Sequence, residues 1–308
     1  LVSSFEEMTE LPKSLRSLLS EKASISPLEK VKTLVSEDGT QKHLFKLSDG
    51  HLIESVLIPE RDHLTLCISS QAGCAMGCRF CLTAAQGLKR NLKPSEIIEQ
   101  VIQIKRSMDD PAKLTNIVLM GMGEPLANYD AVIKAIKNML AQEGMNFSHR
   151  KVTLSTCGLV PEIKRLGQDI TINLAISLNA ADDETRSFLM PVNKRYPLKD
   201  LLAACKDFPL PNRRMLTFEY ILIQGINDSD EDALKLARRL SGLRAKINLI
   251  PLNPYPGCQL LPPPMERTHC FQEILVEKNF TAIIRKSKGR DIMAACGQLS
   301  GTHTTDTT

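Results

Sequence analysis

The chain of 308 residues contains no tryptophan and only four tyrosines. Its aromatic side chains are too few to form a platform on which successive bases of a single strand could stack. No uncharged apolar run approaches the roughly 20 residues of a membrane-spanning helix, and the sequence shows no secretory signal pattern. These absences favour a globular protein that works in the cytoplasm and contacts no membrane.

A disulfide framework is also poorly supported. The nine cysteines are odd in number, and the chain is far longer than the small secreted domains that depend on disulfide bonds. We therefore predict free thiols in a reducing compartment. The histidines show no metal-ligand spacing and are interpreted as surface or packing residues; they are His43, His51, His63, His149, His269 and His303.

Charge gives only a modest indication of a partner. The net charge is +4, which permits contact with nucleic acid without requiring it. A single cluster of basic residues is usually a solvated surface, but this chain has several. They lie at residues 87–93, 148–152, 193–199, 212–214 and 283–290.

The apolar runs of the chain alternate with helical patterns. Six runs are rich in β-forming residues, and their centres lie about 20 to 50 residues apart, which is typical of strand–helix units and not of hairpins. Right-handed connections curl such units into a barrel, and six units instead of eight predict a partial (β/α)6 barrel of the α/β class. The expected strands are residues 64–70, 115–121, 151–156, 171–178, 216–223 and 246–252.

Four helices are expected between these strands, and two of them have clear start signals. The stretch 94–108 opens with Pro94, and the stretch 229–243 opens with Ser229 and Asp232 in a capping-box arrangement. Residues 129–141 and 198–208 show the same periodicity. The positions expected to face the core are Ile97, Val101, Ile104 and Met108 in the first helix, and Ala233, Leu236, Ala237 and Leu240 in the second.

We divide the chain into three segments. Residues 1–59 contain a polar helical stretch and a hairpin around SDG in 41–59, and they are interpreted as an accessory segment packed on the barrel. Residues 60–289 form the core barrel. Residues 290–308 form a C-terminal tail whose end, GTHTTDTT, is expected to be disordered. Because the chain begins at Leu1, we expect a longer N-terminal segment to precede it.

The stretch CISSQAGCAMGCRFC, residues 67–81, gives the strongest chemical signal. Cys74, Cys78 and Cys81 follow the first expected strand with the spacing Cys-x-x-x-Cys-x-x-Cys. Structural zinc needs four ligands, usually as two separated pairs. An iron–sulfur cube held by three cysteines instead leaves one iron open to a small molecule. Phe80 adds an apolar wall beside the thiols, so the pattern favours an iron–sulfur cluster.

This triplet, in a β/α barrel, resembles the signature of the radical S-adenosylmethionine superfamily. The resemblance implies a [4Fe-4S] cluster on Cys74, Cys78 and Cys81, with S-adenosylmethionine chelated to the open iron and cleaved to a 5′-deoxyadenosyl radical. The turn GMGEP, residues 121–125, follows the second expected strand, and its glycines allow the backbone to approach a ligand. Glu124 matches the superfamily's contact to the methionine amino group.

Residues from EMTELPKSLR (7–16) to AACGQL (294–299) resemble one family more closely, the RlmN/Cfr adenine methyltransferases, over nearly the whole chain. The resemblance implies that Cys296 carries a methyl group as S-methylcysteine. It implies that Cys67 forms a transient disulfide with Cys296 and that Glu54 accepts a proton. The positions that match contacts to S-adenosylmethionine are Gly123, Glu124, Ser155, Ser177, Leu178, Asn179 and Asn253.

The implied mechanism explains the two additional thiols. A ring carbon such as C2 of adenine is not a nucleophile, so direct displacement on S-adenosylmethionine fails. One S-adenosylmethionine therefore methylates Cys296, and a second yields the radical that removes a hydrogen from this methyl group. The resulting methylene radical adds to the adenine, which attaches the RNA covalently to the enzyme. Cys67 supports release, and reduction of the Cys67–Cys296 disulfide resets the enzyme.

The sequence GEPL at residues 123–126 is closer to the RlmN pattern than to the Cfr pattern, which has GEAL. We therefore predict methylation of C2, with C8 methylation as the alternative. The implied substrates are an adenine of 23S rRNA and the adenine next to the anticodon of certain tRNAs, with the basic clusters as phosphate contacts around a splayed-out base. An electron donor such as flavodoxin or ferredoxin is implied, and we expect a monomer.

Two positions depart from the family pattern. Asn179 stands where histidine is usual, so this position cannot carry a proton, and Cys157 stands where serine is common. Two other readings stay open. A radical enzyme acting on a small molecule or protein would not need Cys67 and Cys296, and an RNA-binding protein with a structural cluster would not need Glu124. The remaining thiols, Cys205, Cys258 and Cys270, are interpreted as structural.

Overall fold

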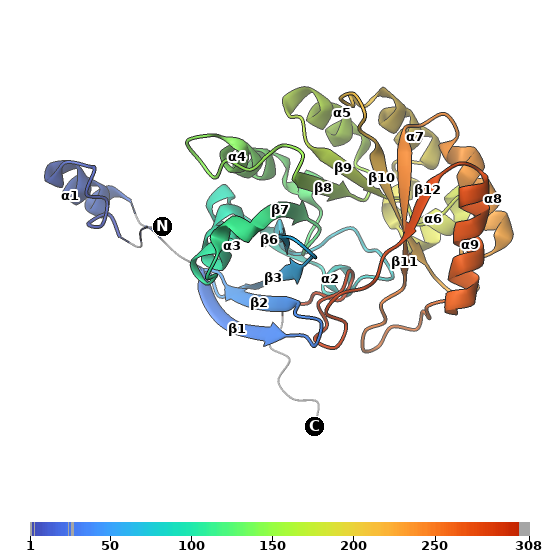
Figure 1. Ribbon diagram of the computed structural model, residues 1–308, viewed down its shortest axis with the longest axis horizontal. Helices are drawn as coiled ribbons and strands as arrows, with labels where there is room; N and C mark the ends of the chain where they lie inside the picture. The colour runs from blue at the N-terminus through green and yellow to red at the C-terminus, as the bar shows by residue number, and fades with distance from the viewer. Residues whose placement is uncertain (1, 3, 24, 26–27, 302–308) are drawn as a thin grey trace.

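A computed structural model describes residues 2, 4–23, 25 and 28–301, and Figure 1 shows how they are arranged. A mixed sheet of ten strands runs through the protein in the order β1–β2–β3–β4–β7–β8–β9–β10–β11–β12. Neighbouring strands from β4 to β12 are parallel, whereas β1 to β4 pair in antiparallel fashion. The end of the predicted disordered tail, residues 302–308, lies outside the described residues.

The strands of this sheet have the following bounds: β1 (Glu29–Val35), β2 (Gln41–Lys46), β3 (Leu52–Pro59), β4 (Leu64–Cys67), β7 (Leu114–Leu119), β8 (Val152–Thr156), β9 (Asn173–Ser177), β10 (Leu216–Leu222), β11 (Ala245–Pro251) and β12 (Thr281–Ile284). A separate hairpin consists of β5 (Gln71–Gly73) and β6 (Leu88–Asn91).

The six predicted barrel strands correspond to β4, β7, β8, β9, β10 and β11, and all are confirmed. The sequence analysis missed β12, because this strand has only four residues and two of them are exposed. The ends of the sheet, β1 and β12, are not neighbours, so the barrel stays open. The prediction of a partial barrel is therefore confirmed.

The N-terminal strands continue the barrel sheet. The predicted hairpin is confirmed as β2 and β3, and β3 pairs with the first barrel strand, β4. The sequence analysis missed β1, whose residues are mostly exposed and show no apolar alternation. The polar helix α1 (Lys13–Lys22) has no buried residue, and Figure 1 shows it set apart from the sheet.

Helices surround the parallel strands, and Figure 1 shows α5 to α9 arranged around β8 to β12. In the described part of the chain, no helix combines the length and the apolar character needed to cross a membrane. The remaining helices are α2 (Leu82–Ala85), α3 (Pro94–Arg106), α4 (Tyr129–Leu140), α5 (Val160–Asp169), α6 (Asp183–Leu189), α7 (Leu198–Asp207), α8 (Asp230–Leu240) and α9 (Met265–Glu277), with 3-10 turns at Pro111–Lys113, Pro125–Asn128 and Pro191–Lys194.

The predicted helix start signals act as expected. Pro94 opens α3, and the reciprocal bonds between Ser229 and Asp232 cap α8. The predicted inward positions of α8 are all buried, as are Ile97, Val101 and Ile104 of α3. These faces pack into one continuous core with the strands. The helices therefore fix the strand ends, where side chains of the site project.

The segment after β12 returns across the open side of the sheet to the N-terminal strands. Asp291 accepts a hydrogen bond from the Ser36 hydroxyl at 2.5 Å, and the Lys42 ammonium group donates to the Met293 carbonyl at 3.1 Å. The backbone amide of Gly289 donates to the Asp38 carboxylate at 3.1 Å. Residues 289–301, named here the closing segment, thus link the two ends of the sheet.

Candidate active site

A cavity of about 150 Å³ lies at the C-terminal ends of the parallel strands. Residues at or just after the ends of β7 to β11 line it, together with the loop between β5 and α2 and part of the closing segment. In a β/α barrel, this end brings functional side chains together. Nine of the predicted site residues line the cavity: Cys74, Cys78, Cys81, Gly123, Glu124, Ser155, Ser177, Asn179 and Cys296.

Four predicted site residues, Glu54, Cys67, Leu178 and Asn253, are not part of the cavity wall. All four are buried. The side chain of Leu178 packs in the hydrophobic core, and its backbone amide donates to the Glu219 carbonyl at 2.9 Å. The cavity therefore gathers most, but not all, of the predicted site.

The three thiols of the triplet reach the cavity from one loop, residues 74–81, which is named here the cysteine loop. Burial raises the pKa of Cys74 to about 12 and that of Cys78 well above its ordinary value, and the charge on Cys81 raises both further. A bound metal reverses this preference, because a coordinating thiol loses its proton outright.

The arrangement of these thiols suits a cluster better than a single ion. Within the described chain, no three His, Cys, Asp or Glu residues are placed to hold one metal ion. A cluster has several irons, and each thiolate can bind a different one. Three thiols around one cavity, with an open side toward Glu124 and the strand ends, therefore fit the predicted [4Fe-4S] cluster.

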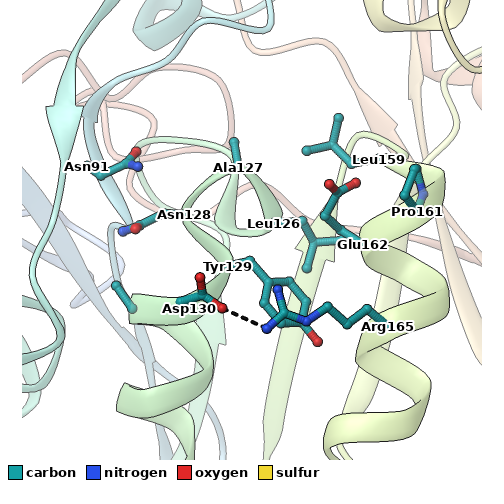
Figure 2. A pocket seen from close by; sticks show the side chains of 11 residues that line it. Asn91, Leu126, Ala127, Asn128, Tyr129, Asp130, Leu159, Pro161, Glu162 and Arg165 are labelled. Atoms are coloured by element: carbon teal, nitrogen blue, oxygen red, sulfur yellow. Dashed lines mark hydrogen bonds and ion pairs between the residues drawn. The ribbon is translucent and has the colours of Figure 1, made fainter.

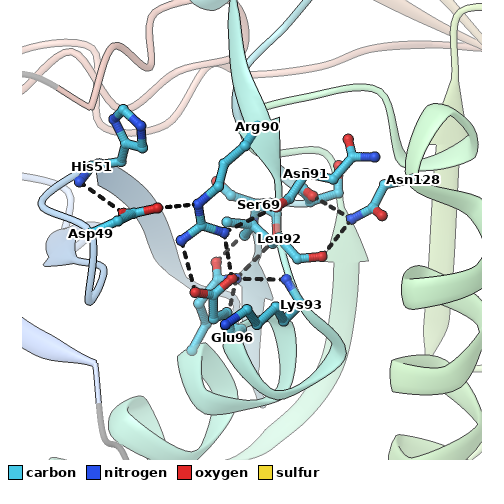
Figure 3. Close-up of polar contacts among 11 residues, drawn as sticks. Asp49, His51, Ser69, Arg90, Asn91, Leu92, Lys93, Glu96 and Asn128 are labelled. Carbon is cyan, nitrogen blue, oxygen red and sulfur yellow. Dashed lines mark hydrogen bonds and ion pairs between the residues drawn. The ribbon is translucent and has the colours of Figure 1, made fainter.

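A polar network holds the entry to the cysteine loop (Figure 3). Arg90 of β6 forms ion pairs with Asp49, in the turn between β2 and β3, and with Glu96, in the first turn of α3. The distance from Arg90 Nη1 to Glu96 Oε2 is 2.8 Å. Because β6 pairs with β5, which leads directly into Cys74, this network fixes where the loop begins.

The glycine turn after β7 packs against the protein backbone more closely than the sequence analysis expected. A Cβ atom on Gly121 would lie 2.7 Å from the Ile68 backbone, and one on Gly123 would lie 2.5 Å from the Gln71 Cβ. Gly123 also has a φ of +99°, which favours glycine. These glycines therefore allow the turn to approach the chain after β4, as well as lining the cavity.

Glu124 is fixed at the cavity wall by the backbone. Its carboxylate accepts hydrogen bonds from the amides of Leu126 at 3.0 Å and Cys157 at 2.8 Å. Burial raises the pKa of Glu124, and these backbone bonds oppose the shift. Hydrogen bonds from the side chains of Thr156 and Cys157 oppose the shift as well, and the carboxylate faces the cavity, where its charge suits the ammonium group of a ligand.

Short polar side chains stand at the next strand ends. The hydroxyls of Ser155 and Ser177 lie 3.5 Å apart on the cavity wall. Asn253, which follows β11, is buried, and its amide nitrogen donates to the Cys296 carbonyl at 3.3 Å. Its side-chain oxygen has no hydrogen-bond partner among the described residues. Such an orphaned buried acceptor fits a site that is completed by a polar ligand.

Both polar atoms of the Asn179 side chain have partners within the protein. Its side-chain oxygen accepts from the Ile221 backbone amide at 2.8 Å, and its nitrogen lies 3.2 Å from the Met190 sulfur. Its φ of +60° is a conformation that asparagine tolerates better than most residues. This residue lines the cavity but also joins the ends of β9 and β10.

Cys296 lies on the closing segment and faces the triplet. The Cys296 side chain is exposed, and it lines the cavity. Burial among protein atoms raises the pKa of its thiol to about 11, and charges on Glu219 and Cys81 contribute to the shift. The segment is anchored beside it, since Leu82 donates to the Gly297 carbonyl at 2.8 Å and Thr83 to the Leu299 carbonyl at 2.6 Å.

Cys67 ends β4, and its thiol is buried. Burial raises the pKa of Cys67, and the charge on Cys296 raises it further. The two thiols are therefore near enough to influence each other electrostatically, although both are free in this structure. The fold thus brings together two thiols that are 229 positions apart in the sequence (296 − 67).

Comparisons with known proteins agree with this geometry. A model of the Radical SAM superfamily matches residues 68–237. A dual-specificity RNA methyltransferase RlmN from Syntrophus aciditrophicus (strain SB) is 55% identical over 298 residues, which cover 97% of this chain and 86% of that protein. This chain belongs to the RlmN family. The predicted resemblance is therefore confirmed.

Two further relatives support the RlmN assignment. The RlmN of Geobacter sulfurreducens (strain ATCC 51573 / DSM 12127 / PCA) is 54% identical over 299 residues, covering 97% of this chain and 82% of that protein. The structure of a radical SAM methyltransferase from Sphaerobacter thermophilus is similar with a TM-score of 0.93 and 45% identity, covering 98% of this chain and 89% of that one. As an RlmN-family radical SAM enzyme, the chain uses a [4Fe-4S] cluster and S-adenosylmethionine.

Glu54 of this RlmN-family chain lies in a buried ion pair. Its Oε1 is 3.1 Å from the Lys42 ammonium nitrogen, and the two side chains are 2% and 4% exposed. Its Oε2 accepts from the backbone amides of Ser300 at 2.7 Å and Gly301 at 3.1 Å. The carboxylate therefore anchors the closing segment to β3, while its role as a proton acceptor stays a prediction.

Replacing Lys42 by methionine is expected to lower the free energy of unfolding by about 3–5 kcal/mol, because it leaves the buried Glu54 charge without its cation. Urea unfolding measures this change. Lys46→Met is the matched control on the same strand, since the ion pair of Lys46 with Glu29 is 47% and 64% exposed and such pairs contribute about 1 kcal/mol or less. Equal losses for both variants would contradict the assignment.

The sequence analysis missed two residues of this RlmN-family site. Arg186 is fully buried, and its guanidinium donates to the carbonyls of Leu178 at 3.0 Å and Cys157 at 2.7 Å, which joins the ends of β8 and β9. Nothing in the sequence distinguishes it from a surface arginine on a helix. Glu219 lines the cavity, and burial raises its pKa. A carboxylate inside the apolar strand LTFEYILI was a usable signal for this residue.

A larger cavity of about 400 Å³ lies away from the thiols, at the N-terminal ends of α4 and α5 (Figure 2). Arg165 crosses it, with its guanidinium 4.1 Å from the centre of the Tyr129 ring and 2.8 Å from the Asp130 carboxylate. Its lining shares no residue with the cavity of the predicted site. The predicted site of this RlmN-family protein therefore lies in the smaller of these two cavities.

Proposed function

We propose that this chain methylates C2 of an adenine in RNA, with Cys296 as the methyl carrier and Cys67 as the thiol that releases the product. Radical SAM RNA methyltransferase activity follows from its membership of the RlmN family. The finer proposal depends mainly on one observation. Cys296 lines the same cavity as the triplet, and the buried Cys67 lies within reach of its charge.

The cofactors, when bound, supply one electron and a carbon-centred radical. The residues of the chain would hold S-adenosylmethionine and shield it from solvent. Glu124 lines the cavity, where its carboxylate is placed to attract the ammonium group of S-adenosylmethionine. The hydroxyls of Ser155 and Ser177 supply polar contacts on the cavity wall. Asn253 lies outside that wall but contacts the Cys296 carbonyl, and its orphaned oxygen is left for the ligand.

The environment of Cys296 suits a methyl carrier. Burial raises the pKa of its thiol to about 11, and the positive charge of Arg285 opposes this shift. The thiol must lose its proton before it takes a methyl group, because the thiolate is the nucleophile. Once methylated, the side chain is a neutral thioether, which a buried wall accommodates without the cost of an unpaired charge.

Release of the RNA joins the two thiols. Glu54 takes the proton that C2 loses, and the adduct radical gives up one electron, which the bound cluster would accept. The Cys67 thiol then loses its proton and its sulfur bonds to the Cys296 sulfur. The bond from Cys296 to the transferred carbon breaks with its electron pair going to that carbon, which takes up the proton and becomes the methyl group. Since Glu54 is held by Lys42 and by the amides of the closing segment, its role as proton acceptor requires the closing segment to move. A reductant then restores both thiols.

The proposal is tested with anaerobically reconstituted protein, unmodified 23S rRNA and S-adenosylmethionine, by mass spectrometry of the nucleosides formed. We expect 2-methyladenosine, and none with Cys296→Ala. A product methylated at C8 would keep the chemistry and refute the ring position. Formation of 5′-deoxyadenosine without any methyladenosine, on rRNA and on tRNA, would contradict the proposal.

A further inference from the structure

We propose that the outer side of the cysteine loop is the docking surface for an acidic protein that carries single electrons. This surface, named here the loop patch, consists of Arg79, Phe188, Lys194 and Arg195. The inference rests on the proposed function, because radical chemistry at the triplet consumes an electron that has to be delivered from outside. The carrier therefore needs a place to bind close to the thiols.

The loop patch lies on the side of the cysteine loop opposite to the cavity. Cys78 and Phe80 line the cavity, whereas Arg79 between them is exposed. The Arg79 guanidinium lies 4.1 Å from the centre of the Phe188 ring. Phe188 is 43% exposed, while Met190, two residues later, is buried and lines the cavity. An aromatic ring and a cation thus stand together on the outer surface beside the triplet.

The two other cations of the patch are held against the same loop. The backbone amide of Arg79 donates to the Leu189 carbonyl at 3.0 Å. Pro191 packs on the loop, because its Cγ is 3.5 Å from where a Cβ on Gly77 would lie. Lys194 follows Pro191 by three residues in a 3-10 turn, and residues three apart in such a turn lie on the same side. Lys194 therefore stands on the side of its turn that faces the loop, with Arg195 next to it.

The charges of the patch are available to a partner. Arg79, Lys194 and Arg195 are exposed, and none of them forms an ion pair in the described part of the chain. Glu184 lies one helical turn before Phe188, and Asp183 accepts a hydrogen bond from Asn193 beside Lys194, so these two carboxylates offset two of the three positive charges. Asp182 lies toward Lys235 of α8, whose pKa its charge helps to raise. The patch keeps one net positive charge and complements an acidic surface.

Position distinguishes an electron carrier from RNA at this patch. A target base has to enter the cavity to reach Cys296, so the RNA must approach from the cavity side. A carrier needs only to come close to the thiols, and Arg79 is joined directly to Cys78 and through Phe80 to Cys81. A patch of this size also suits a transient redox encounter, which buries less than about 1,200 Å².

The test uses the cluster-loaded protein and oxidised flavodoxin, an acidic flavin protein, as the probe. Lys194→Glu/Arg195→Glu is expected to weaken flavodoxin binding about tenfold at low ionic strength, measured by calorimetry, and the difference should shrink in high salt. Lys134→Glu/Lys137→Glu, on the exposed face of α4, is the matched control and should keep its affinity. Arg79→Gln provides a second variant that removes charge without reversing it.

Two further measurements separate the possible outcomes. With dithionite as the electron source, the patch variant should form 5′-deoxyadenosine at the wild-type rate, whereas with reduced flavodoxin the rate should fall about tenfold along with binding. Unchanged flavodoxin affinity overturns the proposal, and so does an equal loss of RNA affinity, which would make the patch an RNA contact. Failure of the proposed function is distinguishable, because it would abolish 2-methyladenosine formation even with dithionite while leaving the binding assay intact.

Discussion

Replacing Cys67 by alanine is expected to trap the RNA on the enzyme. Methyl transfer to Cys296 and radical addition to the adenine do not need Cys67, so both steps proceed once. The bond from Cys296 to the base then has no thiol to break it, since Cys67 is the thiol proposed to resolve the bond. Steady-state methylation should fall to background while a covalent protein–RNA adduct accumulates.

Denaturing electrophoresis detects this adduct as a band of reduced mobility, and mass spectrometry after nuclease digestion locates the attached nucleotide on Cys296. Cys205→Ala is the matched control, because Cys205 is also a buried free thiol but lies on α7 outside the cavity wall. Cys67→Ala/Cys296→Ala should give no adduct. An adduct that survives in this double variant would show that another residue bonds to the RNA.

Replacing Cys78 by alanine is expected to remove the metal cluster. If the three thiolates of the triplet hold the cluster as proposed, the two that remain leave a further iron without a protein ligand. The iron content should therefore fall from roughly four atoms per chain toward zero, and both 5′-deoxyadenosine and 2-methyladenosine should fall to background. Iron analysis and the visible absorption of the reconstituted protein measure the first effect independently of activity.

Cys270→Ala serves as the control for this experiment, because Cys270 is a partly buried thiol of α9 that does not line the cavity. It should retain iron, absorption and both products. Thermal unfolding of the two apoproteins shows whether loss of iron reflects loss of fold. Full iron content in Cys78→Ala would refute the assignment of Cys78 as a ligand.

The sequence predicted the elements whose signals are local. The runs that became β4 and β7 to β11 are apolar and separated by amphipathic helices, and the capping residues Ser229 and Asp232 mark the start of α8. Other elements were not predicted, among them the short hairpin strands β5 and β6 and the helices α5, α6 and α9. Two of the missed strands share one physical reason. The strands β1 and β12 lie at the edges of the sheet with several exposed residues, so no clear apolar pattern distinguishes them from loops.

The site was predictable where the residues are close in sequence or match a family motif. The spacing of Cys74, Cys78 and Cys81 is such a signal, and all three line the cavity. The ion pair of Glu54 with Lys42 and the bonds from residues 300 and 301 are not, because they depend on how the closing segment crosses the sheet. The burial of Arg186 was equally hidden, since a helix surface and a strand end meet only in the folded protein.

The closing segment also gives the protein an order of assembly. Every parallel strand and the cysteine loop precede it in the chain, and the contacts of Asp291, Met293 and Ser300 reach back to the antiparallel strands that precede the barrel. Domains fold as they emerge from the ribosome, N-terminal parts first. The open sheet can thus form while the triplet is accessible, and the closing segment with Cys296 follows it. A nascent chain is consequently able to receive its cluster before the closing segment packs beside the triplet.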